Sequence, residues 1–312
     1  MIPASSHSGD SSTGDRSVGT IPELELRIDA HVCLWQEAPP EARAHPQFPG
    51  DDRAYLPRHI APILQRNRFD GAILVTAGTS EVELAQIAEW AEKPIALAGV
   101  IVAWKPNLPL SPSVDRLANT NLLKGIWIDD ETLRDAAART SVYRYCAENG
   151  LTLEVDTAAS SGALNGLRAM ADQDVDAPLV LPHLAGVPAD GEGQVAWTET
   201  MKQLAQRPQV YVKLSGLQSG PTRQWPLAQL QSLFQFFIQH FTEKRLMFGS
   251  DWPYSLPDHA WKTCLARFTQ GLGARPQAFR EHLLGKTAMR VYQISAAPPQ
   301  LDAATDEGLS SS

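Results

Sequence analysis

Eight short runs of Val, Ile and Leu recur along this 312-residue chain, each followed by a segment with helical spacing. The runs are continuous in hydrophobicity, as expected of parallel strands that are buried on both faces. They cover residues 26–33, 71–76, 95–102, 123–128, 151–155, 179–183, 210–214 and 246–249. Eight strands that alternate with helices predict an α/β fold, the (β/α)8 TIM barrel.

Segments with helical periodicity fill the gaps between these runs. We expect helices over residues 81–92, 141–149, 164–172, 197–206, 227–241, 260–270 and 279–294. The main competing fold is an open, doubly wound sheet, which would need a glycine-rich phosphate turn after an early strand. The residues after the first run read LWQE, so that turn is missing and the barrel is favoured.

Composition and charge indicate where the folded domain begins and ends, and they exclude several classes of function. Residues 1–20 and 297–312 are polar and nearly free of apolar side chains, so we predict a disordered tail at each end and one barrel over 22–295. A net charge of −8 without a Lys/Arg cluster argues against a nucleic-acid partner. No run has membrane-spanning length, no secretory signal is visible, and three scattered cysteines form no disulfide framework. We therefore predict a cytoplasmic monomer or small homo-oligomer without a membrane partner.

Polar side chains stand at the ends of three of the predicted strands. Asp251 follows the last run, in the motif RLMFGSDWPYS, and His183 ends the sixth. In the first run Asp29, His31 and Cys33 share one face, because residues i and i+2 of a strand point the same way. Barrels of parallel strands carry their chemistry at the carboxyl ends of the strands. These distant segments therefore predict one shared site.

The motifs IDAHVCLW, LPHLAGVP, VYVKLSGL and RLMFGSDWPYS resemble those of the amidohydrolase superfamily. They look most like its lactone-hydrolase branch, which includes 2-pyrone-4,6-dicarboxylate lactonase, sulfomuconolactone hydrolase and the sugar-acid lactonases. The resemblance covers residues 26–294 and implies a barrel hydrolase in which His31, His183 and Asp251 match the family's site positions. The family's first strand usually ends in His-x-His, and Cys33 stands where the second histidine is expected.

Lactone hydrolysis needs an activated water, stabilisation of the oxyanion and a proton for the leaving oxygen. We predict that Asp251 is the general base and that His31 and His183 polarise the carbonyl, directly or through a metal. The structural alternatives are a helix-capping aspartate and histidines that only fix loops.

The sequence does not decide whether the site uses a metal cofactor, because Cys33 can be interpreted in three ways. It is interpreted as a small buried residue, as a zinc ligand beside His31, His183 and Asp251, or as a nucleophile. Relatives of the pyrone lactonase work without metal, so we expect no strict cofactor requirement, with zinc as the alternative. Glu154 takes the fifth-strand position where many superfamily members carry a metal-binding histidine, which argues against a two-metal centre; its structural alternative is a salt-bridged barrel glutamate.

Four cations near strand ends suggest the class of substrate. Lys124, Arg134, Lys213 and Arg223 would clamp carboxylate or sulfonate groups, while Trp127 would face a planar ring. The alternative is that these cations are solvated and that the tryptophan belongs to the core.

The combined prediction is a hydrolase that opens an acidic lactone of aromatic-compound catabolism, a dicarboxylate or sulfo-carboxylate such as a sulfomuconolactone or a pyrone dicarboxylate. A sugar-acid lactonase is the alternative within the same class. A metal-dependent non-oxidative decarboxylase would need the complete His-x-His pair. A barrel that binds a ligand without catalysis would explain Cys33 but not the retained Asp251.

Overall fold

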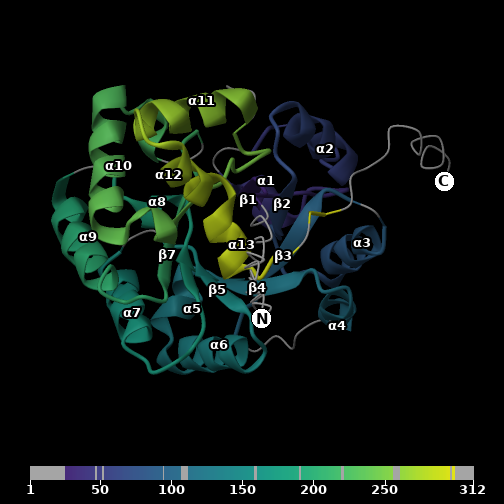
Figure 1. The fold of residues 1–312 in the computed structure, drawn as a ribbon. Helices are drawn as coiled ribbons and strands as arrows, with labels where there is room; N and C mark the ends of the chain where they lie inside the picture. The colour runs from purple at the N-terminus through teal and green to yellow at the C-terminus, as the bar shows by residue number, and fades with distance from the viewer. Residues whose placement is uncertain are drawn as a thin grey trace, which may run out of the picture.

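Eight parallel strands in sequence order form the centre of the computed structural model (Figure 1). The model describes residues 25–45, 48–50, 53–93, 95–106, 112–157, 160–189, 191–218, 221–255, 261–295 and 297–298. The strands are β1 Ile28–Val32, β2 Gly71–Val75, β3 Leu97–Ala103, β4 Leu123–Ile128, β5 Thr152–Val155, β6 Leu179–Leu181, β7 Val210–Leu214 and β8 Leu246–Phe248. The predicted barrel is confirmed, with strand bounds within two residues of most predicted runs.

The sheet closes on itself where the end of β1 meets the chain that leaves β8. Val32 forms a parallel bridge with Trp252, and the Cys33 backbone N–H donates to the Trp252 carbonyl oxygen at 2.7 Å. This closure brings the first and last strands of the barrel side by side, so residues more than 200 positions apart can share one site.

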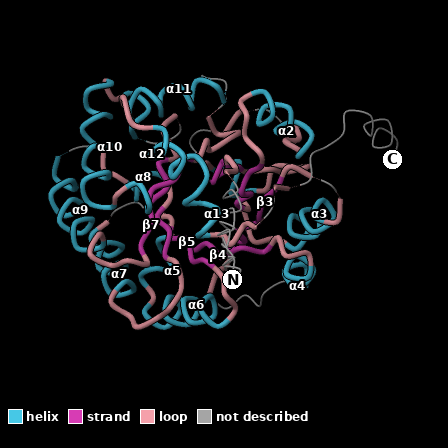
Figure 2. Tube along the Cα trace, in the orientation of Figure 1, coloured by secondary structure: helices cyan, strands magenta, loops and turns pink. Residues whose placement is uncertain are grey.

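Helices surround the strands as an outer ring (Figure 2). They are α1 Pro40–Ala44, α2 Pro57–Arg66, α3 Glu81–Ala91, α4 Pro112–Asn119, α5 Asp130–Arg134, α6 Ala136–Glu148, α7 Ser161–Ala171, α8 His183–Gly186, α9 Gly191–Leu204, α10 Leu227–Phe241, α11 Trp261–Leu272, α12 Gln277–Glu281 and α13 Thr287–Val291. Short turns of other helix types are η1 Pro221–Gln224, η2 Glu243–Arg245 and η3 His282–Lys286. Helix α6 begins earlier than predicted because Asp135 caps it, accepting hydrogen bonds from the Ala137 and Ala138 backbone.

The C-terminal helices close the amino end of the barrel. A Cβ atom on Gly285 would lie 1.7 Å from the carbonyl oxygen of Leu26, just before β1, so only glycine allows this contact. Tyr292, which follows α13, is fully buried and reaches into the barrel interior.

The described residues contain no helix with both the length and the apolarity of a membrane span. The predicted tails at 1–20 and 297–312 lie outside the described residues, apart from 297 and 298.

Candidate active site

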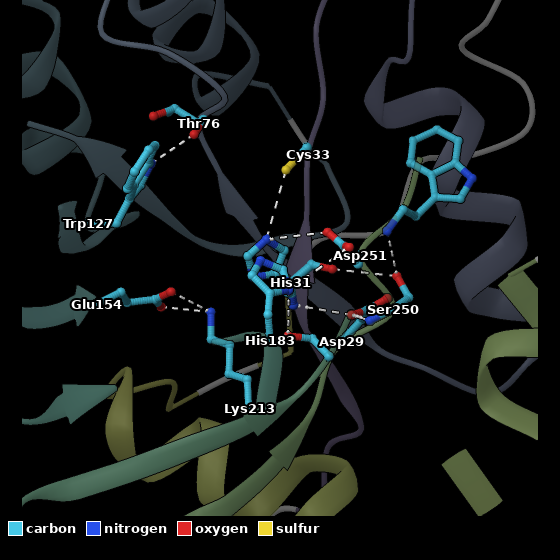
Figure 3. A network of polar contacts seen from close by, with 12 residues as sticks. Asp29, His31, Cys33, Thr76, Trp127, Glu154, His183, Lys213, Ser250 and Asp251 are labelled. Carbon is cyan, nitrogen blue, oxygen red and sulfur yellow. Dashed lines mark hydrogen bonds and ion pairs between the residues drawn. The ribbon is translucent and has the colours of Figure 1, made fainter. Parts of the chain in front are cut away.

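The carboxyl ends of β1, β6 and β8 bring His31, His183 and Asp251 together (Figure 3). His31 Nε2 lies 3.8 Å from Asp251 Oδ1, and His183 Nδ1 lies 4.0 Å from Asp251 Oδ2. The centroids of the two imidazole rings are 4.6 Å apart. One carboxylate therefore faces both imidazoles, and a small group bound between them would contact all three side chains.

A turn after β8 aims the Asp251 side chain. Asp251 has a φ of +58°, a left-handed conformation that aspartate tolerates better than most residues. Its backbone N–H donates to the His31 carbonyl oxygen at 2.9 Å. This bond fixes the backbone of the carboxylate residue to the backbone of the imidazole residue.

Asp29 supports this turn and does not belong to the described cavity wall. Its Oδ1 accepts from the Ser250 backbone N–H at 2.8 Å, and its Oδ2 accepts from Trp261 Nε1 at 2.8 Å. Burial raises the pKa of Asp29 to about 6, although the hydrogen bonds from Ser250, Trp261 and His31 oppose the shift. The expected shared face is therefore wrong for Asp29: its carboxylate binds Ser250 and Trp261, whereas His31 and Cys33 line the cavity.

His31 is suited to act as a neutral imidazole. Its side chain is buried, and burial lowers its pKa well below the usual range, helped by the nearby charges of His183 and Lys213. Within the described residues, His31 Nδ1 has no hydrogen-bond partner. A neutral imidazole can donate one hydrogen bond or bind a metal ion, and both uses fit a carbonyl-polarising role.

His183 sits on a left-handed turn. His183, Leu184, Ala185 and Gly186 all have φ between 51° and 62°, so β6 ends at Leu181 and the predicted strand does not continue to His183. A non-glycine residue in this conformation costs about 1–2 kcal/mol. The turn is held from outside, because Trp197 Nε1 donates to the Ala185 carbonyl oxygen at 2.8 Å.

Ser215, just after β7, fixes the orientation of His183. Its Oγ accepts from the His183 backbone N–H at 3.0 Å and lies 3.3 Å from His183 Nδ1. A hydroxyl has one proton and two acceptor lone pairs, so Ser215 can hold Nδ1 in either ring tautomer while it accepts from the backbone. The sequence predicted no role for the Ser215 side chain.

These residues open into a cavity of about 640 Å³ at the carboxyl end of the barrel. Trp127 forms part of its wall, with Nε1 donating to the Thr76 carbonyl oxygen at 2.8 Å. Sequence reasoning missed Glu41, His45, Asp156 and Tyr254, which also line the cavity. Only Asp156 carried a usable signal, because it directly follows the predicted fifth strand.

The cavity wall is acidic. It includes Glu41, Glu154, Asp156 and Asp251, and no Lys or Arg occurs among its described residues. Exposed Glu41 and Asp156 carry the charge furthest toward solvent.

The four cations that the sequence predicted to bind the substrate do not line the described cavity. Lys213 is fully buried, with Nζ 2.7 Å from Glu154 Oε1, and Arg134 pairs with Asp130 and Ser160. Lys124 lies near the amino end of β4, and Arg223 lies in η1 outside the described cavity wall. These four side chains are therefore not part of the proposed substrate site.

The donor atoms of His31, His183 and Asp251 lie within 4.8 Å of one another, and two imidazoles with one carboxylate suit a zinc ion. His31 Nε2 faces Asp251 Oδ1 at 3.8 Å, and His31 Nδ1 is buried without a hydrogen-bond partner among the described residues. The residues thus fit a single metal ion.

Cys33 lies in the cavity wall with Sγ 4.0 Å from His31 Nε2, but outside this three-residue group. Burial raises the pKa of Cys33 well above its usual range, and the Asp251 charge adds to the shift. The protein alone therefore keeps Cys33 as a thiol, which is a poor nucleophile and a poor metal ligand.

Comparison with known proteins gives a consistent picture. Residues 28–294 match the model of the amidohydrolase family. An L-fucono-1,5-lactonase of Burkholderia ambifaria is 27% identical over 87% of this chain and 97% of its own length. An amidohydrolase of Burkholderia multivorans, crystallised with bound HEPES, superposes with a TM-score of 0.71 at 25% identity, over 86% of this chain and all of its own. A Pseudomonas putida protein described as a candidate 2-pyrone-4,6-dicarboxylic acid hydrolase gives 0.68 at 20% identity, over 88% of this chain and all of its own.

Proposed function

Because this chain belongs to the amidohydrolase family, we propose that it opens a lactone ring with Asp251 as the base that activates water. The observation that carries the proposal is the position of the Asp251 carboxylate, which faces two imidazoles at 3.8 and 4.0 Å inside a cavity. The lactonase named among the relatives supports the same reaction class.

The proposed reaction divides into two proton transfers. Asp251 takes a proton from water as the water oxygen bonds to the lactone carbonyl carbon. Hydrogen bonds from His31 and His183 stabilise the negative charge that develops on the carbonyl oxygen. Asp251 then returns the proton to the ring oxygen as the C–O bond breaks. The product is a hydroxy acid, and the carboxylate of Asp251 is restored.

His31, His183 and Asp251 would also hold a zinc ion, which supplies Lewis-acid polarisation of a carbonyl when bound. Metal binding requires a neutral imidazole, and burial, which lowers the pKa of His31, favours that state. Independence from a tightly held metal remains our prediction, because the two imidazoles already supply donors for the carbonyl oxygen.

We propose a neutral, polyhydroxylated substrate, a sugar-acid lactone, in place of the acidic lactone that the sequence favoured. The carboxylates of Glu41, Asp156 and Asp251 in the cavity wall would repel a di-anion and accept hydrogen bonds from hydroxyl groups, whereas Lys213 compensates the charge of Glu154. The relative named as an L-fucono-1,5-lactonase supports this class. The role in aromatic catabolism belongs to the acidic-lactone alternative, and the cytoplasmic location and the oligomeric state remain predictions from the sequence.

The test is acid release by the purified protein from two panels of lactones. One panel holds neutral aldono-1,5- and 1,4-lactones, and the other holds dicarboxylate and sulfonated lactones, each corrected for spontaneous hydrolysis. We expect catalysis on the neutral panel, with and without a chelator, and loss of that catalysis in Asp251→Asn. Hydrolysis of the charged panel alone would overturn the substrate class, and catalysis of neither would overturn the function.

A further inference from the structure

The loop after β1 carries two side chains into the cavity wall. Its ends are paired by two backbone hydrogen bonds, from Trp35 N–H to the Tyr55 carbonyl oxygen at 2.9 Å and from Tyr55 N–H to the Trp35 carbonyl oxygen at 2.8 Å. The chain between them includes α1, and its residues Glu41 and His45 line the cavity. This loop therefore forms part of the site, together with the strand ends that carry the proposed chemistry.

The His45 ring packs against the turn that carries the proposed base. Its imidazole lies on the ring of Tyr254, with the ring centroids 4.1 Å apart and the planes inclined by 36°. Tyr254 belongs to the turn after Asp251, in which the Ser255 backbone N–H donates to the Asp251 carbonyl oxygen at 3.1 Å. The ring contact thus holds His45 at the end of the barrel where Asp251 lies.

His45 also interacts electrostatically with the residues of the candidate site. Burial lowers the pKa of His45 below its usual value of 6.5, and among the nearby charges Asp251 raises it and His183 lowers it. Burial is likewise the main cause of the low pKa of His31, and the charge of His45 adds to that shift. At neutral pH the His45 ring is therefore uncharged, with one donor and one acceptor nitrogen.

The backbone of the loop does not require a histidine at position 45. The His45 N–H donates to the Ala42 carbonyl oxygen at 3.1 Å, and the His45 carbonyl oxygen accepts from the Phe48 N–H at 2.9 Å. Any residue except proline could make both bonds, and a phenylalanine could also pack on Tyr254. What the imidazole adds is a hydrogen-bonding edge on a half-buried side chain of the cavity wall.

We propose that His45 is a substrate-binding residue whose imidazole forms a hydrogen bond with a hydroxyl group of the lactone. Tyr254 is the positioning residue on which the imidazole rests. A hydroxyl group and a neutral imidazole can each donate and accept one hydrogen bond, so the two are complementary. The inference rests on the proposed lactonase function and on a polyhydroxylated substrate, and it concerns binding and leaves the proton transfers to Asp251.

The experiment measures KM and kcat for a neutral polyhydroxylated 1,5-lactone and for the unsubstituted 1,5-lactone. The unsubstituted lactone is followed as a competitive inhibitor where its own hydrolysis is too slow. His45→Phe keeps an aromatic ring on Tyr254 and removes the hydrogen-bonding nitrogens, so the KM of the polyhydroxylated lactone should rise about three- to tenfold. The kcat and the affinity for the unsubstituted lactone should stay within about twofold of the wild type.

Two further variants separate hydrogen bonding from packing. His45→Ala leaves more room than the phenyl ring and should raise the same KM by at least as much, because the hydrogen bond and the ring contact are both lost. His240 offers a matched control, since it packs against Phe236 with ring centroids 4.7 Å apart but does not line the described cavity. His240→Phe should leave the values for both lactones within about twofold of the wild type.

A KM for the polyhydroxylated lactone that stays within about twofold of the wild type in both His45 variants would overturn the inference while leaving lactone hydrolysis intact. So would an equal loss of affinity for both lactones, which indicates a distorted cavity, or a fall in kcat at unchanged KM, which indicates a role in the chemistry. Absence of hydrolysis of both lactones by the wild type would instead refute the proposed function.

Discussion

Asp251 and His31 lie together in two ways: His31 Nε2 is 3.8 Å from Asp251 Oδ1, and the Asp251 backbone N–H donates to the His31 carbonyl oxygen at 2.9 Å. The second contact explains how a carboxylate and an imidazole from opposite ends of the sequence keep a fixed separation. A proposed base and a proposed hydrogen-bond donor therefore move as one unit. Fixed geometry of this kind is what a hydrolytic site requires.

Asp251→Asn should lower kcat by roughly two to four orders of magnitude, because the amide cannot take a proton from water. The backbone bond to His31 is retained, so the unfolding midpoint should stay close to that of the wild type. Initial rates and thermal unfolding measured on the same preparation check both statements. A folded variant with wild-type turnover would refute the role of Asp251.

Ser215→Ala should lower kcat by about tenfold, because the His183 ring loses the hydroxyl that orients it and the His183 backbone N–H loses its acceptor. Ser215→Thr keeps the hydroxyl and is the matched control, expected to recover most of the rate. Equal rates for all three proteins would show that Ser215 does not position His183.

Cys33→Ser should change kcat/KM by less than about tenfold, because the Cys33 thiol stays protonated in the protein alone and serves as part of the wall. Metal content, measured in parallel for the wild type and the variant, decides between the interpretations of Cys33. Stoichiometric zinc in the wild type, lost together with activity in the variant, would identify Cys33 as a ligand.

Arg223→Gln should leave the KM of neutral and di-anionic lactones within about twofold of the wild type, because Arg223 lies in η1, away from the described cavity wall. Steady-state kinetics with one lactone of each charge provide the measurement. A tenfold rise in KM confined to the di-anion would restore the anion clamp that the sequence predicted.

Glu83 should make stability depend on pH in a defined window. Burial raises its pKa from 4.5 to about 7, with hydrogen bonds from the Ala77 and Gly78 backbone opposing the shift. The folded state thus holds this proton more tightly than the unfolded state. The contribution of Glu83 to the free energy of unfolding is constant below pH 4.5, falls by up to roughly 3 kcal/mol as the pH rises to 7, and is constant above.

Denaturant unfolding of the wild type and Glu83→Gln at several pH values tests this. The stability of the wild type relative to the variant should decrease between pH 4.5 and 7. A difference that does not vary with pH would contradict the raised pKa.

The sequence was sufficient for the barrel because its information is local: apolar runs of strand length followed by helical periodicity appear wherever a strand and its helix occur. It also located His31, His183 and Asp251, since each lies within or just after the end of an apolar run. Whether these three act in catalysis stays a prediction.

The rest of the site depends on contacts between distant segments. Lys213 lies on a strand that faces Glu154, and only the assembled barrel shows that the two side chains pair. The irregular register after Asp29 and the left-handed turn at His183 depend on support from Ser250 and Ser215, far away in the sequence. No periodicity encodes such contacts, so the sequence could not show that Lys213 pairs with Glu154 instead of lining the cavity.

The contact of Gly285 with Leu26 affects how the substrate reaches the site and how the product leaves it. Because the C-terminal helices cover the amino end of the barrel, we expect lactone and hydroxy acid to pass through the opening of the cavity at the carboxyl end. The lactone enters without charge, but the product leaves as an anion past the exposed carboxylates of Glu41 and Asp156. Repulsion between these carboxylates and the anionic product favours product release, so accumulated product should inhibit only weakly. An inhibition constant for the hydroxy acid far below the KM of its lactone would contradict this.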